Sequence, residues 1–229
     1  MRAVIFGATG MVGQGVLREL LRDPGVESVL SIVRRRSGVA HPRLREIVHQ
    51  DFYDFSSLES ELAGYDACFF CLGVTSLRKS EAEYRRLTYD LTLAAAAPLA
   101  RLNPKMAFLY VSGTGTDSTE HGRVMWARVK GETENALLEL FPNAVMIRPG
   151  YIQPMHGIVS PSKWTRRGYA VVGALYPLLR ALFPKSVTNT EELGRAMIRA
   201  ARGESPKKIL EPPDLIALGR DRPGSTVNS

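Results

Sequence analysis

Three glycines spaced three residues apart, Gly7, Gly10 and Gly13, are the first residues whose types and spacing point to chemistry. They follow a short apolar run at 2–6 and precede apolar residues at helical spacing. A strand that enters a helix through such a turn leaves the first N–H groups of the helix free and exposes its positive dipole end. Small loop residues let a pyrophosphate approach that backbone. We therefore predict a dinucleotide site rather than a bare turn, with phosphate contacts from Gly7, Thr9, Gly10, Met11, Val12 and Gly13.

A basic tripeptide, Arg34 to Arg36, follows the second predicted strand. In dinucleotide-binding folds this place lies about 20 residues beyond the glycines and contacts the adenosine ribose. An acidic residue there bonds the 2′-hydroxyl of NAD, whereas arginine accommodates the 2′-phosphate of NADP. Because no carboxylate is present at this place, we expect Arg34 and Arg35 to bind NADP, with NAD the less favoured cofactor. The alternative is a solvated basic loop.

Further candidate contacts follow the next two predicted strands. Asp51 and Phe52 come after the run at 45–49, where they would flank an adenine. The run at 66–72 is almost continuously apolar, as a parallel strand covered on both faces should be. It ends in a small-residue turn at the edge of the sheet where such folds place ligands. We expect the middle of the cofactor to be lined there by Leu72, Gly73 and Val74.

Both cysteines, Cys68 and Cys71, lie in this apolar run. A C-x-x-C pair can be redox-active. Residues three apart on a strand point to opposite faces, however, and neither a second pair nor a nearby histidine completes a metal site. We expect two buried core thiols and no metal.

The composition limits the class of protein. The 229 residues are 45% hydrophobic and 23% charged, which is ordinary for a globular protein. No apolar run approaches the roughly 20 residues that span a bilayer, and the N-terminus shows no cleavable signal pattern. We therefore expect a cytoplasmic protein. The formal net charge of +7 favours an acidic ligand. Nucleic acid is not expected, because neither a helix-turn-helix pattern nor interleaved basic and aromatic residues are present.

The elements that must position these residues alternate between strands and helices. Apolar runs predict strands at 2–6, 28–33, 45–49, 66–72, 106–111 and 144–147. Helical spacing predicts helices between them, at 11–21, 54–62, 80–102 with an interruption at Pro98, and 122–140. Repeated strand–helix–strand units predict an α/β fold, a doubly wound parallel sheet of the Rossmann type with helices on both faces. We assign residues 1–152 to this core.

The last third has a different pattern. Residues 153–187 are expected to form a small helical cap on the substrate side, loop-like from Tyr151 to 162 and apolar with basic flanks over 163–185. A lid or core role is favoured there over contact with a membrane surface or a second subunit, and Pro177 argues against one long membrane-lying helix. The protein would be a monomer or a homodimer.

Residues 188–220 are expected to add the last helix and the sheet edge to the same domain. Thr188 and Glu191 match a capping box at the start of that helix. Residues 221–229 have no periodicity and are expected to form a loose tail.

In this order, GATGMVG, Asp51, CLGVT, YVSGTGT, WARVKGETEN and IRPGYI resemble the short-chain dehydrogenase/reductases. Specifically, they are similar to the atypical, epimerase-like branch that includes the Tat-interacting oxidoreductase group. The resemblance covers residues 1–152 closely and 188–202 loosely. It implies a catalytic serine after the fifth strand, and on the next helix a Tyr-x-x-x-Lys pair whose lysine holds the nicotinamide ribose. Ser112 and Lys130 match, whereas the tyrosine position is Trp126. The nicotinamide is then expected among Ser112, Lys130, Pro149, Gly150, Tyr151 and Ile152.

This replacement leaves catalysis open. Trp126 lies one helical turn before Lys130, but an indole N–H cannot give up its proton at neutral pH, and no tyrosine is followed by lysine four residues later. In one interpretation Tyr151, His121, His156 or a bound water supplies the proton. In a second, the protein binds NADP without turnover, as a sensor or scaffold. In a third, Trp126 is a stacking platform for an aromatic or lipid-like substrate.

We expect hydride transfer on a small or apolar carbonyl substrate. The alternative is a catalytically silent NADP(H)-binding protein, with peripheral membrane contact as one form of it. Two simpler roles stay open as well: Trp126 packs beneath residues 151–185, and Lys130 is a solvated helix lysine.

Overall fold

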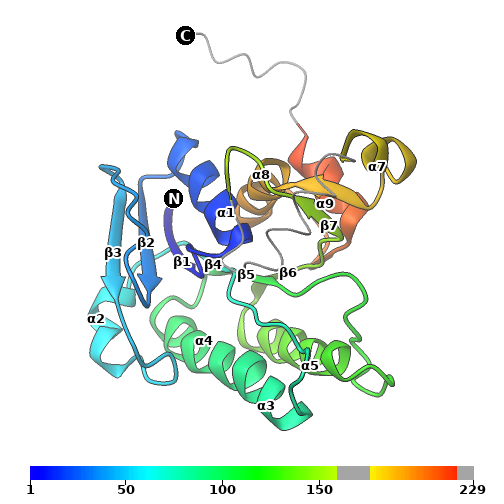
Figure 1. Ribbon diagram of the computed structural model, residues 1–229. Coiled ribbons are helices and arrows are strands. Elements are labelled where there is room, and N and C mark those ends of the chain that lie inside the picture. The colour runs from blue at the N-terminus through cyan, green and yellow to red at the C-terminus, as the bar shows by residue number, and fades with distance from the viewer. Residues whose placement is uncertain (159–175, 221–229) are drawn as a thin grey trace.

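A computed structural model describes residues 1–158 and 176–220 of the chain (Figure 1). At its centre lies a seven-stranded, all-parallel sheet of order β3-β2-β1-β4-β5-β6-β9. These strands are β1 (Arg2–Phe6), β2 (Ser28–Val33), β3 (Leu44–Val48), β4 (Ala67–Phe70), β5 (Ala107–Val111), β6 (Asn143–Ile147) and β9 (Ile209–Leu210). The order reverses between β1 and β4. The predicted doubly wound parallel sheet is therefore confirmed.

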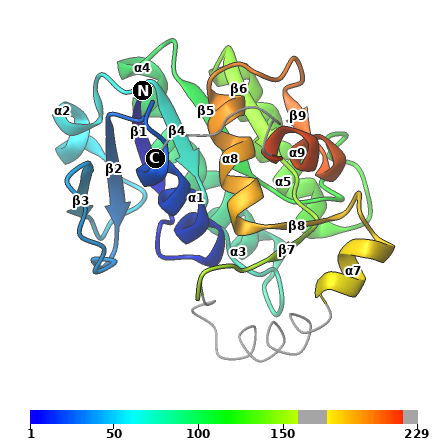
Figure 2. The same ribbon diagram turned by 90° about the horizontal axis from the view of Figure 1, so that it is seen from above.

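Alternation along the strands divides the core into two layers. In β1, Ala3 and Ile5 belong to one apolar cluster and Val4 and Phe6 to the other. The first face is covered by α1 (Met11–Arg22) and α8 (Thr190–Ala201), with α9 (Pro212–Gly219) next to α8 (Figure 2). The second face is covered by α2 (Glu59–Leu62), which follows a 3-10 turn (Ser56–Leu58), and by α4 (Leu91–Leu102) and α5 (Met125–Leu140).

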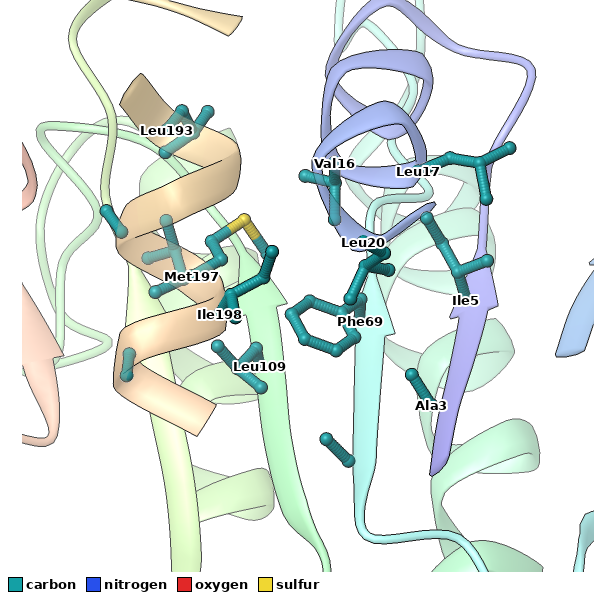
Figure 3. Close-up of a cluster of buried hydrophobic side chains, with 14 of the residues drawn as sticks. Ala3, Ile5, Val16, Leu17, Leu20, Phe69, Leu109, Leu193, Met197 and Ile198 are labelled. Carbon is teal, nitrogen blue, oxygen red and sulfur yellow. The ribbon is translucent and has the colours of Figure 1, made fainter. Parts of the chain in front are cut away.

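The layer under α1 and α8 fixes where the opening helix lies on the sheet. Figure 3 shows Leu20 of α1 and Met197 of α8 directed at Phe69 and Leu109 of the strands below. These four side chains are fully buried. Burial of this apolar surface, worth roughly 25 cal/mol per Å², holds α1 against the sheet from which its N-terminal loop emerges.

Between β4 and β5 the chain forms one continuous helical region. It consists of α3 (Glu81–Arg85), a π-helical turn (Arg86–Asp90) and α4. The predicted interruption at Pro98 is wrong, because Pro98 lies inside α4. A proline costs the helix one hydrogen bond. Ala95, Ala96 and Leu99 are fully buried around it, and their packing keeps the helix in place.

The chain leaves the main sheet after β6 and returns through a second, two-stranded parallel sheet of β7 (Tyr151–Gln153) and β8 (Val187–Asn189). The prediction of a loop from Tyr151 onward is therefore wrong at its start. Residues 151–153 form a strand because they pair with β8, with Tyr151 opposite Val187. Of the predicted cap at 153–187, the structure describes residues 153–158 and 176–187, which include α7 (Tyr176–Leu182) with Pro177 in its first turn. Most of 163–185, with its predicted membrane contact, and the predicted tail at 221–229 lie outside the described residues.

The start of α8 differs from the prediction by one residue. Its N-cap is Asn189, whose side-chain oxygen accepts the N–H groups of Glu191 at 3.0 Å and Glu192 at 2.8 Å. The predicted capping box of Thr188 and Glu191 is wrong, because Thr188 is held extended in β8 and its hydroxyl donates to Glu192 instead. In the described part of the chain, no helix is long and apolar enough to cross a membrane.

Candidate functional site

The carboxyl ends of the central strands bring the predicted site residues to one edge of the sheet. Phe6, the last residue of β1, lies opposite Ile32 of β2 on one side and Phe70 of β4 on the other. β5 and β6 continue the same edge, with Val111 opposite Ile147. Because all these strands are parallel, the loops that follow them emerge together. They meet at the switch point between β1 and β4, where open α/β sheets bind ligands.

The glycine loop has the close contacts that its spacing predicts. Gly7 has a φ of +80°, and a Cβ there would lie 2.7 Å from the carbonyl carbon of Cys71 at the end of β4. A Cβ on Gly13 would lie 2.0 Å from the carbonyl oxygen of Gly7. Gly7 therefore permits the tight turn, and Gly13 permits the close packing of α1 against that turn.

The N-terminus of α1 is open to an anion. Its N-cap is Gly10, which has no side chain to accept a hydrogen bond, and its first turn, Met11 to Gly13, holds no acidic residue. The loop is shaped by its own contacts, because Gln14 Nε2 donates to the Thr9 carbonyl at 3.0 Å and Gly10 N–H donates to Gly7 O at 2.9 Å. The first-turn N–H groups and the helix dipole thus form a cradle for a negative group.

The two predicted phosphate-binding arginines lie beside this cradle. Arg34 and Arg35 are exposed directly after β2, and within residues 1–158 and 176–220 neither has an ion-pair partner. A cavity of about 500 Å³ opens between the glycine loop, α1 and the segment that follows the arginines. Thr9, Ser37 and His41 are among its lining residues. Arg34 and Arg35 themselves are not among the residues that line this cavity; they are exposed on the segment that leads to Ser37.

The residues predicted to flank an adenine separate in the structure. Asp51 is exposed, and its Oδ1 accepts the Tyr53 N–H at 2.9 Å. Phe52 is only 7% exposed, and its ring packs edge-on against Phe6 and Phe55. The side chain of Phe52 therefore lies in the core, and of the two residues only Asp51 is exposed.

The turn after β4 lies at the site edge. Leu72 packs on the core, while Gly73 and Val74 are exposed. The turn begins beside the glycine loop, because Cys71 N–H donates to Phe6 O at 2.9 Å. Both cysteines are free thiols that pack on opposite faces of the sheet, as expected. Burial raises the pKa of the Cys71 thiol to about 12, so it carries no thiolate at neutral pH.

Lys130 reaches the end of β5 from α5. Its ammonium donates a hydrogen bond to the main-chain carbonyl of Ser112. Burial lowers the pKa of Lys130 to about 8, against the nearby Glu134 carboxylate, which favours the charged form. The simpler interpretation of Lys130 as a solvated helix lysine is therefore wrong.

The hydroxyl of Ser112 is already engaged. Ser112 is 7% exposed, and its Oγ donates to Glu134 Oε1 at 2.5 Å. Glu134 is fully buried and also accepts hydrogen bonds from Arg148 Nε at 3.1 Å and from Arg148 Nη2. Sequence reasoning missed this carboxylate. The available signal was a glutamate one helical turn after Lys130, on the same helix face.

Trp126 lies over the loop after β5. A Cβ on Gly115 would lie 3.4 Å from its Cη2 atom, so the indole covers this glycine. Gly115 has a φ of +84°, which keeps the loop tight below the ring. Among the described residues, the indole N–H has no hydrogen-bond partner.

The strand after β6 supplies only part of the expected nicotinamide surface. Pro149 and Ile152 are buried, and Ile152 belongs to the apolar core. Gly150 packs against Ser186, whose carbonyl would lie 2.4 Å from a Cβ. Tyr151 remains accessible, and its hydroxyl donates to Gln153 Oε1 at 2.8 Å. The side chain of Ile152 is therefore part of the core, while Tyr151 beside it is half-buried.

A second cavity, of about 380 Å³, lies beside these residues and is lined by Thr114, Gly150, Tyr151, Phe183, Ser186, Val187 and Pro212. Thr114 was missed by sequence reasoning. It is exposed, and its N–H donates to Pro149 O at 3.0 Å. The signal was present in SGTGT, where three hydroxyl residues, Ser112, Thr114 and Thr116, follow β5. Only the fold shows that Thr114 is the exposed one of the three.

Comparisons with known proteins agree with this geometry. The family of NAD(P)H-binding proteins matches residues 7–152. Two similar relatives are "Protein fmp52-2, mitochondrial" of Aspergillus terreus, 27% identical over 96% of this chain and 97% of its own, and "Protein fmp52, mitochondrial" of Emericella nidulans, 28% identical over 88% and 89%. Their names contradict the expectation of a cytoplasmic protein, which is therefore wrong.

Solved structures share the fold. A short-chain dehydrogenase/reductase family oxidoreductase from Burkholderia thailandensis has a TM-score of 0.66 at 16% identity, over 94% of this chain and 92% of its own. A short-chain dehydrogenase from Burkholderia cenocepacia, solved in complex with NADP, has a TM-score of 0.64 at 16% identity, over 92% and 86%. At this identity the likeness concerns the fold alone.

Proposed function

The chain belongs to the NAD(P)H-binding family, and from this premise we propose that it binds NADP(H) and transfers hydride between that cofactor and a small or apolar carbonyl substrate. The observation that carries the proposal is the uncapped N-terminus of α1, with two exposed arginines one strand away that have no ion-pair partner among the described residues. A pyrophosphate suits the first-turn N–H groups of Met11 and Val12, and a 2′-phosphate suits Arg34 and Arg35.

The glycine positions support a nucleotide at this place. A Cβ on Gly10 would lie 3.3 Å from Gly7 O, so a side chain there would crowd the loop. When bound, the cofactor would supply or accept the hydride. The Lys130 ammonium would hold the nicotinamide ribose, since it lies at the end of β5 on the same edge of the sheet. Asp51 is exposed at the far side of that edge, where the adenine would lie.

The cavity of about 380 Å³ supports the substrate class. Its lining combines the apolar side chains of Phe183, Val187 and Pro212 with the hydroxyls of Thr114 and Tyr151. Such a lining suits a small apolar molecule with one carbonyl group. In this proposal the Thr114 and Tyr151 hydroxyls orient the carbonyl. Tyr151 donates the proton after its hydroxyl exchanges Gln153 Oε1 for the substrate oxygen.

A second candidate function is a catalytically silent NADP(H)-binding sensor or scaffold. Two observations favour it: the Ser112 hydroxyl donates a hydrogen bond to Glu134, and the tyrosine position holds Trp126, which covers Gly115. Neither residue is then free to move a proton. His156 is held as well, because its Nε2 lies 3.0 Å from Glu191 Oε2.

One experiment separates these functions. Isothermal titration with NADP⁺, NADPH, NAD⁺ and NADH measures binding, and the loss of NADPH absorbance over a panel of aldehydes and ketones measures turnover. Tight binding of NADPH with turnover supports the reductase, and binding without turnover supports the silent protein. Absence of binding by all four nucleotides refutes both.

A further inference from the structure

Glu134 connects the ends of two strands from inside the molecule. Its carboxylate is 0% exposed on α5, one helical turn after Lys130. It accepts hydrogen bonds from the Ser112 hydroxyl at 2.5 Å and from Nε and Nη2 of Arg148. Ser112 directly follows β5, and Arg148 directly follows β6. A buried carboxylate is tolerated only with such charged and hydrogen-bonded partners, so its place is fixed by them.

Ser112 connects Glu134 to Lys130. The same residue donates its hydroxyl to Glu134 and offers its main-chain carbonyl to the Lys130 ammonium. Its N–H and Oγ also contact the Ile147 carbonyl of β6, at 2.9 Å and 3.2 Å. Ser112, which accepts the hydrogen bond of the Lys130 ammonium, is thus itself bonded to Glu134, one turn after Lys130 on α5.

Arg148 extends the connection to the other side. Its Nη1 donates to Glu211 at 3.1 Å and its Nη2 to the Ser118 hydroxyl at 2.5 Å, while its N–H donates to Leu210 O of β9. Thr114 follows Ser112 by two residues, and Gly150 follows Arg148 by two. Both line the substrate-side cavity. The carboxylate of Glu134 therefore holds both loops that line this cavity, the one after β5 through Ser112 and the one after β6 through Arg148.

We propose that Glu134 is a positioning residue of the site, which fixes the ends of β5 and β6 relative to each other and directs the Lys130 ammonium at Ser112. This deepens the proposed function, since it assigns a task to a side chain that touches neither cofactor nor substrate. The charged and titratable groups around it are Lys130 on its own helix, Arg148 after β6 and the buried phenol of Tyr110 on β5. The carboxylate favours the charged form of the lysine, against the effect of burial.

Glu134→Gln tests this in the protein without any nucleotide. The chain has seven lysines, so the titration of Lys130 can be followed by NMR of ¹³C-labelled lysine and assigned with Lys130→Arg. We expect the midpoint for Lys130 to fall by about one pH unit, because an opposite charge nearby shifts a pKa by that order. A purely structural role would lower the melting temperature and leave the midpoint in place. An unchanged midpoint overturns the proposal.

Glu132→Gln is the matched control. Glu132 lies two residues earlier on α5 and pairs with Arg85 at 2.6 Å, away from Lys130. We expect no change of the Lys130 midpoint in this variant. An equal shift in both variants would show a general charge effect and would overturn the specific role of Glu134.

Ser112→Ala covers the case in which Glu134→Gln does not fold. It keeps the ion pair of Glu134 with Arg148 and removes only the hydroxyl that joins β5 to it. We expect amide exchange at Thr114 to become about tenfold faster, because local opening follows the loss of a tether. Unchanged exchange overturns the proposal. Failure of the native protein to bind NADPH would refute the proposed function, while both of these measurements would still decide the role of Glu134.

Discussion

The hydroxyl of Ser112 and the carboxylate of Glu134 lie 2.5 Å apart inside the sheet–helix interface. The residue expected to orient a substrate is therefore part of the interior framework. Arg148 completes the framework with a bidentate contact to the same carboxylate. This arrangement makes the site edge depend on one buried ion pair, whose removal has consequences that can be measured.

Arg148→Met should destabilise the fold strongly. It leaves the carboxylate of Glu134 buried without its charged partner, and removal of one member of a buried pair costs about 3–5 kcal/mol. Urea unfolding followed by circular dichroism gives the free energy of unfolding. Arg85→Met is the control, because Arg85 and Glu132 form a partly exposed pair, for which the loss is about 1 kcal/mol or less. Equal losses in the two variants would contradict the burial argument.

Gly13→Ala should damage both stability and nucleotide binding. The new Cβ would lie 2.0 Å from Gly7 O, so α1 must move away from the loop that it supports. Overpacking of this kind costs about 1–3 kcal/mol. Gly73→Ala serves as the stability control, because nothing lies within 4 Å of its Cβ position. Thermal unfolding and nucleotide titration measure the two effects, and a Gly13→Ala protein as stable as Gly73→Ala would refute the close packing.

Replacing Arg34 and Arg35 together by alanine should weaken binding of NADP⁺ by at least about tenfold, since each charge-assisted contact is worth about 1.5–3 kcal/mol. Binding of NAD⁺, which lacks the 2′-phosphate, should change little. A double variant of Arg45 and Arg101, two exposed arginines paired with Glu61 and Glu59, makes the same change of net charge away from the site. Equal weakening of NADP⁺ in both variants would assign the effect to overall charge.

NADPH affinity should fall as the pH rises through about 8, because the Lys130 ammonium then loses its proton. The effect on stability has the opposite direction. The folded pKa lies below the ordinary value of 10.5, so the unfolded chain binds more protons between these values and stability rises with pH there. Lys130→Met should therefore stabilise the protein at pH 7 by roughly 1–3 kcal/mol. This gain should shrink from about pH 8 to about pH 10. Unfolding curves at several pH values check it, and a constant gain would contradict it.

Trp126→Tyr should raise the rate of carbonyl reduction, because a phenol one turn before Lys130 supplies the acid that the indole lacks. General acid catalysis is worth about 10²–10⁴-fold. Trp126→Phe is the matched control, since it makes the same change in size without a hydroxyl. NADPH consumption with the carbonyl panel measures the rates. Equal rates for the two variants would show that position 126 has no part in proton transfer.

The sequence by itself determined the fold, because turn glycines, strand alternation and helical spacing each depend on residues close together in the chain. The glycines of the first loop, the alternation of Ala3 and Ile5 with Val4, and the helical stripe of α1 each act within a few residues. They gave the doubly wound parallel sheet and the place of the glycine loop. The arginines after β2 were predicted from their spacing along the chain, about 20 residues beyond the glycines, where dinucleotide-binding folds contact the adenosine ribose.

Only the tertiary structure decided which of these side chains are free to act. Phe52 and Ile152 entered the core, and Ser112 rather than Thr114 turned to Glu134, because burial and hydrogen bonding depend on elements distant in sequence. β7 exists through its pairing with β8, and no pattern within 151–153 contains that partner. A short segment can specify its own backbone, but its neighbours in space specify whether a hydroxyl, a ring or an ammonium is available to a ligand.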